Sequence, residues 1–378
     1  MMRDMFKQFS LLVFSAMLVI FLFPTCKHTQ KTPLSSSRNN QKTPISIVSP
    51  YKDVNWETFG QYKAALHVHT SRSDGAHTLS QMVEDHYAKG YDILAITDHN
   101  VLNRDWTSGP NALAPQRYIE ITQGAGRNGR GMIRIPEANE QSHSEHLNTF
   151  FAPFNNTFSS SLIANIKQTQ EIGGLSFINH PGRYYRETIT GANNPSVIKK
   201  YADLFLEFPS CVGLEIINYR DRYTVDRILW DNILIQTAAR GRYVWGFSND
   251  DTHTIQHTGF SYNIFVMPKN TVENFRAAFI SGSFYAVAQT AKLELGADFA
   301  ASPPAPVITN IKVDDNVMSI TITALNMERI EWIADGQIIS SGDTLFVLEH
   351  HAEINFYVRA NILGHGGVVF TQPFGVLY

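Results

Sequence analysis

"ALHVHTSRSDGAHTLSQMVEDHYAKGYDILAITDHN", residues 65–100, joins two apolar segments that each end in side chains able to bind a metal ion. The first segment ends in His67 and His69, and these two imidazoles would share one face because side chains alternate along a strand. The second ends in "TDH" at residues 97–99. Between them, Thr78 begins a capping-box pattern that predicts an amphipathic helix. The stretch therefore predicts a strand–helix–strand unit with a metal-binding edge.

The same alternation of short apolar runs and helix-like segments continues to about residue 296. Four further runs are interpreted as strands: "GMIRIPE" (131–137), "GGLSFINH" (173–180), "CVGLEIIN" (211–218) and "RYVWGFSND" (242–250). Strands that are apolar almost throughout and alternate with helices are typical of parallel sheets. We therefore expect an α/β fold whose parallel sheet is covered by helices and is either open or closed into a barrel.

Residues with metal-binding side chains stand at the ends of all these strands. In parallel α/β proteins, functional groups gather at the carboxyl ends of the strands. The ends carry His67, His69, Asp98, His99, Glu137, Asn179, His180, Glu215, Asp250, Asp251 and His253. One such motif alone would be weak evidence for a metal site. Six strand ends of this kind together favour a metal site, because buried ionisable side chains that pair only with one another would cost stability. Imidazole and carboxylate ligands suit zinc, manganese or iron.

Seven short segments carry a resemblance to a known family. They are "HVHTSRSDG", "AITDHN", "PE", "EHLNTFF", "NHPG", "EIIN" and "NDDTH", in this order within residues 64–253. Together they resemble the PHP family, which is named for polymerase and histidinol phosphatase. The later segment "WDNILIQTAARGRYVWGFSNDDTH" (230–253) is most similar to secreted members of that family. The resemblance implies a distorted (β/α)7 barrel that carries two or three divalent metal ions, zinc, manganese or iron, at the carboxyl ends of its strands.

The resemblance also implies which residues hold the metals. Three groups are expected: His67, His69, Glu137 and Asp251; Glu137, His146 and His180; and Asp74, His99 and His253. Glu137 would bridge the first two ions. Asp98 and Glu215 are expected beside the ligands, where carboxylates orient imidazole rings.

Some of these positions have close competitors. Glu140, His143 and Glu145 lie near His146 in the sequence, and His146 is preferred because apolar and aromatic residues follow it, as in the family. His143 is interpreted as a surface histidine.

The family's Asp-x-His spacing selects Asp251 over Asp250, which is expected beside the ligands. His77 and His86 fall in the predicted helix region and are expected to face solvent.

The expected reaction is hydrolysis of a phosphoester by a hydroxide that bridges two metal ions. Glu137 and Asp98 would serve this chemistry, and Arg183 would neutralise phosphoryl oxygens unless it is a plain surface residue. The substrate would be a small or oligomeric phosphoester. Two alternatives stay open: hydrolysis of a carbamate, amide or ester at the same metals, and a non-catalytic binding lipoprotein. The net charge of −3 gives no sign of specific nucleic-acid binding.

The N-terminal segment has the pattern of an export signal. A basic start precedes the uncharged run Phe9–Phe23, and a cysteine, Cys26, follows it. Residues 1–26 are therefore interpreted as a bacterial lipoprotein signal with lipidation at Cys26, which predicts an exported protein anchored in the cell envelope. Cleavage by ordinary signal peptidase is the alternative. Residues 27–55 are polar and are interpreted as a flexible tether.

The composition supports two folded parts. The hydrophobic content of 43% can fill a sizeable core, and residues 56–300 are expected to form the metal-binding barrel. Cys211, within an apolar run, is expected to be buried. After the linker "ASPPAP" (301–306) the pattern changes to short alternating segments without helices. Residues 303–378 are therefore expected to form a small β-sandwich of immunoglobulin-like type.

Overall fold

The computed structural model describes residues 46–157 and 160–378, which lie within one compact unit that begins at Lys42. The expected signal segment, Cys26 and most of the expected tether lie outside the described residues. None of the helices in the described ranges is long and apolar enough to cross a membrane.

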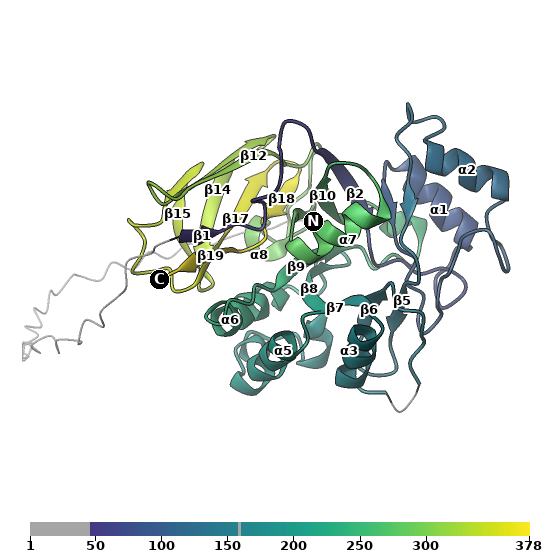
Figure 1. Ribbon diagram of the computed structural model, residues 1–378, viewed down its shortest axis with the longest axis horizontal. Coiled ribbons are helices and arrows are strands. Elements are labelled where there is room, and N and C mark those ends of the chain that lie inside the picture. Colours follow the sequence, from purple (N-terminus) through teal and green to yellow (C-terminus); the bar gives the residue numbers. More distant parts are fainter. Residues whose placement is uncertain (1–45, 158–159) are drawn as a thin grey trace, which may run out of the picture. The chain divides into compact units, whose positions relative to one another are not determined.

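Helices and strands alternate through the first three quarters of the chain (Figure 1). The helices are α1 (Leu79–Ala88), α2 (Pro115–Gln123), α3 (Leu162–Glu171), α4 (Ile189–Ala192), α5 (Pro195–Glu207), α6 (Asp226–Ala238), α7 (Val272–Ser281) and α8 (Lys292–Leu295). The predicted capping box is present at the start of α1, where the Thr78 side chain accepts from the Gln81 backbone and the Gln81 side chain accepts from the Thr78 backbone.

Each segment that was expected to be a strand within residues 56–250 overlaps a strand of the structure. These are β2 (Gly60–Ala65), β3 (Ile93–Leu94), β4 (Ile133–Arg134), β7 (Leu175–Ile178), β8 (Cys211–Asn218) and β9 (Trp245–Asn249). They form two parallel groups in two different sheets, β2–β3–β4 and β7–β8–β9. The second group continues antiparallel into β6 (Leu147–Phe150) and β5 (Asn139–Gln141), so the strand–helix alternation is interrupted there.

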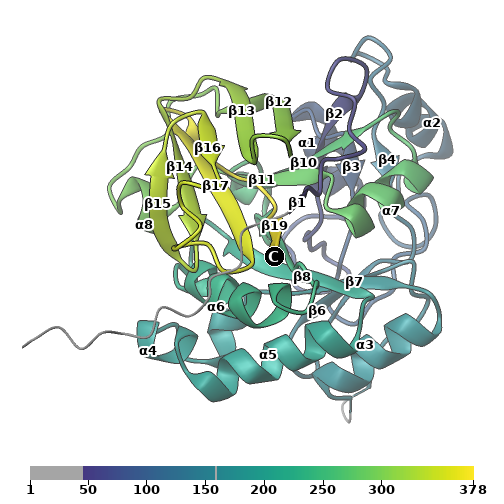
Figure 2. The ribbon, with the colours of Figure 1, turned by 60° about the vertical axis from the view of Figure 1, so that its left-hand side comes forward.

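Single bridges join the two sheets where their strands end. Val68, just beyond β2, pairs with Thr252, just beyond β9, and His99, beyond β3, pairs with Glu140 in β5. A shared core of aromatic side chains fills the space between the sheets, with Phe177 of β7 stacked on Phe247 of β9 at 4.4 Å. Figure 2 shows α3 and α5 on the side of β6, β7 and β8. This packing brings the carboxyl ends of both parallel groups together.

The C-terminal strands are divided between two sheets, one of which also contains strands from the earlier part of the chain. Three of them, β12 (Val307–Asp314), β13 (Ser319–Leu325) and β16 (Thr344–Phe346), form a small sheet. The others, β14 (Arg329–Ala334), β15 (Gln337–Ser341), β17 (Tyr357–Gly364), β18 (Gly367–Phe370) and β19 (Phe374–Leu377), belong to the eleven-stranded sheet that also contains β2–β4, β10 (Ser261–Met267) and β11 (Phe284–Ala288).

Strand β18 makes this continuity, because it pairs with β11 on one side and β17 on the other. Apolar side chains such as Trp332 and Leu345 fill the space between the small sheet and the large one. One layer of the expected sandwich is thus shared with the preceding segment, and a separate immunoglobulin-like domain over 303–378 is not confirmed.

The end of the expected tether is part of the fold. Residues 46–48 form β1 (Ser46–Val48), which pairs with β19. Tyr51 is buried, and its hydroxyl donates to the Phe284 carbonyl and accepts from the Gln372 backbone N–H, each at 2.9 Å. Residues 46–51, within the expected tether, are therefore folded, because β1 pairs with a C-terminal strand that lies far away in sequence and Tyr51 is buried.

Candidate metal centre

His67 and His69 lie just beyond the end of β2, and both are buried. The backbone there pairs with the segment that follows β9: His69 N–H donates to the Thr252 carbonyl at 2.8 Å, and Thr252 N–H donates to the His67 carbonyl at 3.2 Å. This pairing sets the two histidines beside Asp251 and His253, which flank Thr252. The alternation expected from the sequence thus places both imidazoles on the side where the other polar strand ends meet.

The carboxylate of Glu140 lies at the centre of the site. It is fully buried, and five imidazoles approach it: His67 Nε2 at 3.2 Å, His69 Nε2 at 3.7 Å, His99 Nδ1 at 2.5 Å, His146 Nδ1 at 2.9 Å and His180 Nε2 at 3.5 Å. The Asn179 amide donates a further hydrogen bond to it at 2.6 Å. Burial alone would raise the pKa of Glu140, but the nearby imidazoles outweigh it and hold the pKa well below its usual range. Glu140 is therefore an anion at neutral pH.

Glu137, expected to bridge two ions, is not among the residues that converge on this centre. Its backbone turns into the left-handed region, with φ of 52°, and its carbonyl accepts from Ala152 N–H. The chain then re-enters a strand at β5, whose bridge to His99 directs Glu140 towards the cluster. This corrects the prediction: the central carboxylate belongs to Glu140 within β5, three residues after Glu137.

Two further groups flank the Glu140 carboxylate. Asp251 Oδ1 lies 3.2 Å from His67 Nε2 and 3.1 Å from His69 Nε2. On the outer side, Asp74 approaches His69 at 3.7 Å, His99 at 3.5 Å and His253 at 3.3 Å. All the histidines and aspartates expected as ligands thus meet in overlapping groups, with Glu140 in the place expected for Glu137.

The donor atoms of these groups fit a divalent cation. Several buried polar atoms of the site make no hydrogen bond of acceptable geometry, although most of them have an oppositely charged neighbour close by: His67 Nε2, His69 Nδ1 and Nε2, His99 Nδ1, Glu140 Oε2, His180 Nδ1 and Asp251 Oδ1. Leaving such atoms unpaired in the interior is costly. Imidazole nitrogens and carboxylate oxygens that share a space without hydrogen-bonding are suited to ligating zinc, manganese or iron.

Glu215 lies beside the ligands, as the sequence led us to expect. Its Oε1 accepts from His67 Nδ1 at 2.7 Å, and its Oε2 accepts from His180 N–H at 2.9 Å. The amide groups of Asn218 and Asn249 also donate to it, each at 2.9 Å. Because Nδ1 of His67 is engaged in this way, its Nε2 is left to face Glu140 and Asp251.

Asp98 has a different role from the one expected. Its buried carboxylate accepts from Thr70 N–H at 2.6 Å, from the Thr70 and Ser73 hydroxyls and from the Asn103 amide, and it contacts no imidazole. It therefore holds the loop that leads to Asp74. The prediction that Asp98 orients a ligand ring is not supported by these contacts, and it does not line the pocket above the ligands.

The competing residues are also placed. Glu145 accepts from Tyr201 at 2.7 Å and pairs with Lys200. Asp250 accepts from three consecutive backbone N–H groups, residues 259–261, on the far side of Asp251. The prediction that His86 faces solvent is wrong, because it is buried in α1 with Nδ1 2.7 Å from the Met82 carbonyl oxygen.

A pocket of about 380 Å³ opens above the candidate ligands. Besides six of them, it is lined by Ser142, Arg183, Arg222 and Tyr223. Arg183 lies on the short 3₁₀ turn Pro181–Tyr184, directly after His180. Arg222 and Tyr223 were not predicted, although they lie in the loop after β8, close behind the "EIIN" segment.

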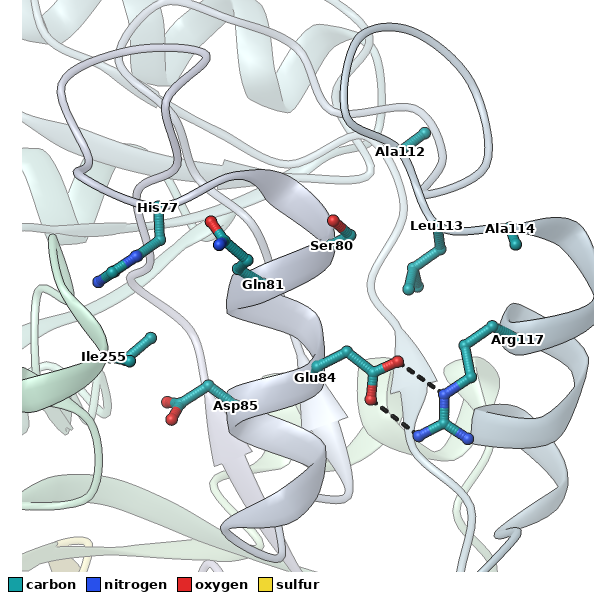
Figure 3. A pocket seen from close by; sticks show the side chains of 10 residues that line it. All are labelled: His77, Ser80, Gln81, Glu84, Asp85, Ala112, Leu113, Ala114, Arg117 and Ile255. Carbon is teal, nitrogen blue, oxygen red and sulfur yellow. Dashed lines mark hydrogen bonds and ion pairs between the residues drawn. The ribbon is translucent and has the colours of Figure 1, made fainter.

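A second pocket, of about 600 Å³, lies between α1 and α2 (Figure 3). Glu84 and Arg117 face each other across it and form two hydrogen bonds of 2.6 and 2.8 Å, and His77 lies at its edge. None of the candidate metal ligands lines this pocket.

Comparison with known proteins finds a PHP domain over residues 65–212, which is less than half of the chain. No curated protein matches. Among solved structures, a two-domain protein from Bacteroides vulgatus containing a predicted PHP-like metal-dependent phosphoesterase has 13% identity and a TM-score of 0.47, covering 90% of this chain and 92% of that one.

Two more distant structures are a lesion-specific endonuclease from Pyrococcus furiosus and an amidohydrolase from Chromobacterium violaceum with bound sulfate and no metal. The endonuclease has 16% identity and a TM-score of 0.36, covering 58% of this chain and 56% of that one. The amidohydrolase has 16% identity and a TM-score of 0.33, covering 50% of this chain and 87% of that one.

Proposed function

We propose that this chain, which carries a PHP domain over residues 65–212, is a metal-dependent phosphoesterase. The observation that carries the proposal is the set of imidazoles around the buried Glu140 carboxylate, whose nitrogen and oxygen atoms lie close together but mostly outside hydrogen-bond geometry. Such a set costs stability unless cations fill it.

Two or three divalent ions, zinc, manganese or iron, would be held by four overlapping groups. These groups are His67, His69 and Asp251; His67, Glu140 and His180; His99, Glu140 and His146; and His69, Asp74, His99 and His253. When bound, such ions supply a nucleophile by lowering the pKa of water towards neutrality. Glu140 would contact more than one ion, because imidazoles of two different groups approach its two oxygens.

The pocket above the ligands favours a phosphoester among the possible substrates. Arg183 lines it, on the turn directly after the candidate ligand His180. Guanidinium groups present planar pairs of donors that match phosphoryl oxygens. Arg183 is positioned by its own turn, where the Arg183 N–H donates to the His180 carbonyl at 3.1 Å, so it would hold a phosphoryl oxygen beside the ligands.

A panel of substrates tests the proposal. Metal-loaded protein of measured metal content should hydrolyse phosphate mono- or diesters, and aryl carbamates, amides and carboxylic esters should react at least about 100-fold more slowly. A strong preference for the carbamates or carboxylic esters would replace the phosphoesterase by another metal-dependent hydrolase. No hydrolysis of any member by fully loaded protein would favour a binding function.

Two further expectations are also proposals. The bridges at residues 68/252 and 99/140 support a distorted seven-stranded barrel made of β2, β3 and β5–β9.

The sequence of residues 1–26 supports export and a lipid anchor at Cys26. Replacing the thiol in Cys26→Ser should release the protein from membranes or block its maturation. Unchanged membrane fractionation and mass of this variant would refute the anchor.

A further inference from the structure

Arg183, Arg222 and Tyr223 line the pocket above the candidate ligands without belonging to any ligand group. Neither guanidinium makes an ion pair with any residue in the described ranges, although two aspartates line the same pocket. Several other arginines in the described ranges do form ion pairs, as Arg227 does with Asp221 at 2.7 Å. Arg183 and Arg222 are exposed at the pocket and are therefore available to an anionic ligand.

The loop that carries Arg222 is held in a fixed conformation. Three consecutive residues, 219–221, have positive φ angles of 42°, 20° and 58°. Such backbone persists only where its surroundings determine it. Here the Asp221 carboxylate is buried against Arg227, and the Arg222 N–H donates to the Asn218 carbonyl at 3.0 Å. The backbone that carries Arg222 is therefore in place before a ligand binds.

Tyr223 contacts both Arg222 and a candidate ligand. Its ring centroid lies 5.7 Å from that of His180, and the Arg222 guanidinium carbon lies 5.4 Å from the same tyrosine ring. Arg222 thus reaches the pocket from the loop after β8, whereas Arg183 follows His180 on the same turn. The phenolic hydroxyl of Tyr223 can donate a hydrogen bond at neutral pH.

We propose that Arg222 and Tyr223 form a second anion subsite, so that the substrate is a phosphate ester with a second anionic group a few bonds from the reacting phosphorus. The inference rests on the proposed function. The reacting phosphoryl group would lie against the candidate ligands and Arg183. The second group, a carboxylate or a phosphate, would accept two hydrogen bonds from the Arg222 guanidinium and one from the Tyr223 hydroxyl.

Phosphonates that cannot be hydrolysed test this subsite directly. Propylphosphonate and 3-phosphonopropionate differ only in that a methyl group is replaced by a carboxylate, and butylphosphonate and 4-phosphonobutyrate form a longer pair. Calorimetry on the manganese-loaded full chain should show at least about 10-fold tighter binding of the carboxylate member in one pair or both. Propane-1,3-diphosphonate in the same assay distinguishes a second phosphate from a carboxylate.

Two variants with one charge fewer provide the comparison. Arg222→Gln should reduce the preference to within about 2-fold and leave binding of the alkylphosphonates within about 3-fold. Arg220→Gln is the matched control, because the Arg220 guanidinium lies over the Phe260 ring at 4.1 Å and does not line the pocket. This control should keep the preference.

The outcomes separate the two proposals. If the second anionic group brings no gain in the wild type, or if Arg222→Gln keeps the preference, the second subsite is refuted while the phosphoesterase stands. If no phosphonate binds to the metal-loaded protein, the site does not accept a phosphoryl group, and both proposals fall.

Discussion

Glu215 Oε1 lies 2.7 Å from His67 Nδ1, and both side chains are completely buried. The contact determines that His67 presents Nε2 to Glu140 and Asp251. Burial alone would lower the pKa of His67, but Asp251, Glu215 and Glu140 outweigh it and raise the pKa well above its usual value. Three polar groups besides His67 converge on Glu215, so its position is fixed independently of His67.

Removing this carboxylate should weaken metal binding. Glu215→Ala leaves His67 free to rotate, and we expect about 10- to 100-fold weaker affinity for the ion that His67 holds. Glu215→Gln keeps an oxygen that can accept from Nδ1 and should lose less. Competition with a chelator of known affinity measures both variants. Equal affinities of wild type and Glu215→Ala would show that Glu215 does not orient His67.

The ion pair between Arg359 and Asp231 should be essential for stability. Arg359 of β17 donates to Asp231 of α6 at 2.7 and 2.8 Å, and both side chains are buried. Arg359→Ala leaves a buried carboxylate without its cation, which should cost about 3–5 kcal/mol in the free energy of unfolding. Denaturant unfolding followed by circular dichroism provides the measurement.

Arg329→Ala is the control for this variant. Arg329 pairs with Glu331 of the same strand, β14, but its side chain is about half exposed. Its loss should therefore cost at most about 1 kcal/mol. Similar losses in the two variants would mean that the contact between α6 and the C-terminal strands contributes little.

The local features of the fold could be predicted from the sequence, because they depend on neighbouring residues. The His67–His69 pair follows from strand alternation, and the start of α1 follows from Thr78 and Gln81. Glu140 could not be chosen over Glu137, because its position depends on a bridge to His99, about 40 residues away.

The pairing of the C-terminal strands could not be predicted from the sequence for the same reason. Their alternation identifies most of them individually, but it does not reveal that β18 pairs with β11 or that β1 pairs with β19. These pairings join segments that are distant in sequence, and each strand pattern would fit several partners.

His86 should make the protein less stable in mild acid. Burial lowers the pKa of this side chain to about 4, despite the contact with the Met82 carbonyl. Between pH 6.5, the ordinary histidine pKa, and about pH 4, the unfolded chain binds a proton that the folded protein does not. Stability should therefore fall by roughly 3 kcal/mol as the pH drops through this window.

Urea unfolding of wild type and His86→Gln between pH 4 and pH 7 tests this dependence. The variant should show a smaller loss over the window, by roughly the same amount, while His77→Gln, at the edge of the α1–α2 pocket, should follow the wild type. An identical pH dependence in His86→Gln and wild type would assign the acid sensitivity to other groups.

The metal content of Glu140→Ala and Glu137→Ala, measured beside the wild type, tests the central claim most directly. Protein beginning near residue 45 should hold two or three divalent ions per chain, and Glu137→Ala should retain them, because its side chain lies outside the ligand groups. Glu140→Ala should lose at least one ion while remaining folded, since the imidazoles that remain lack their shared carboxylate. Full metal content in Glu140→Ala together with loss in Glu137→Ala would contradict this account.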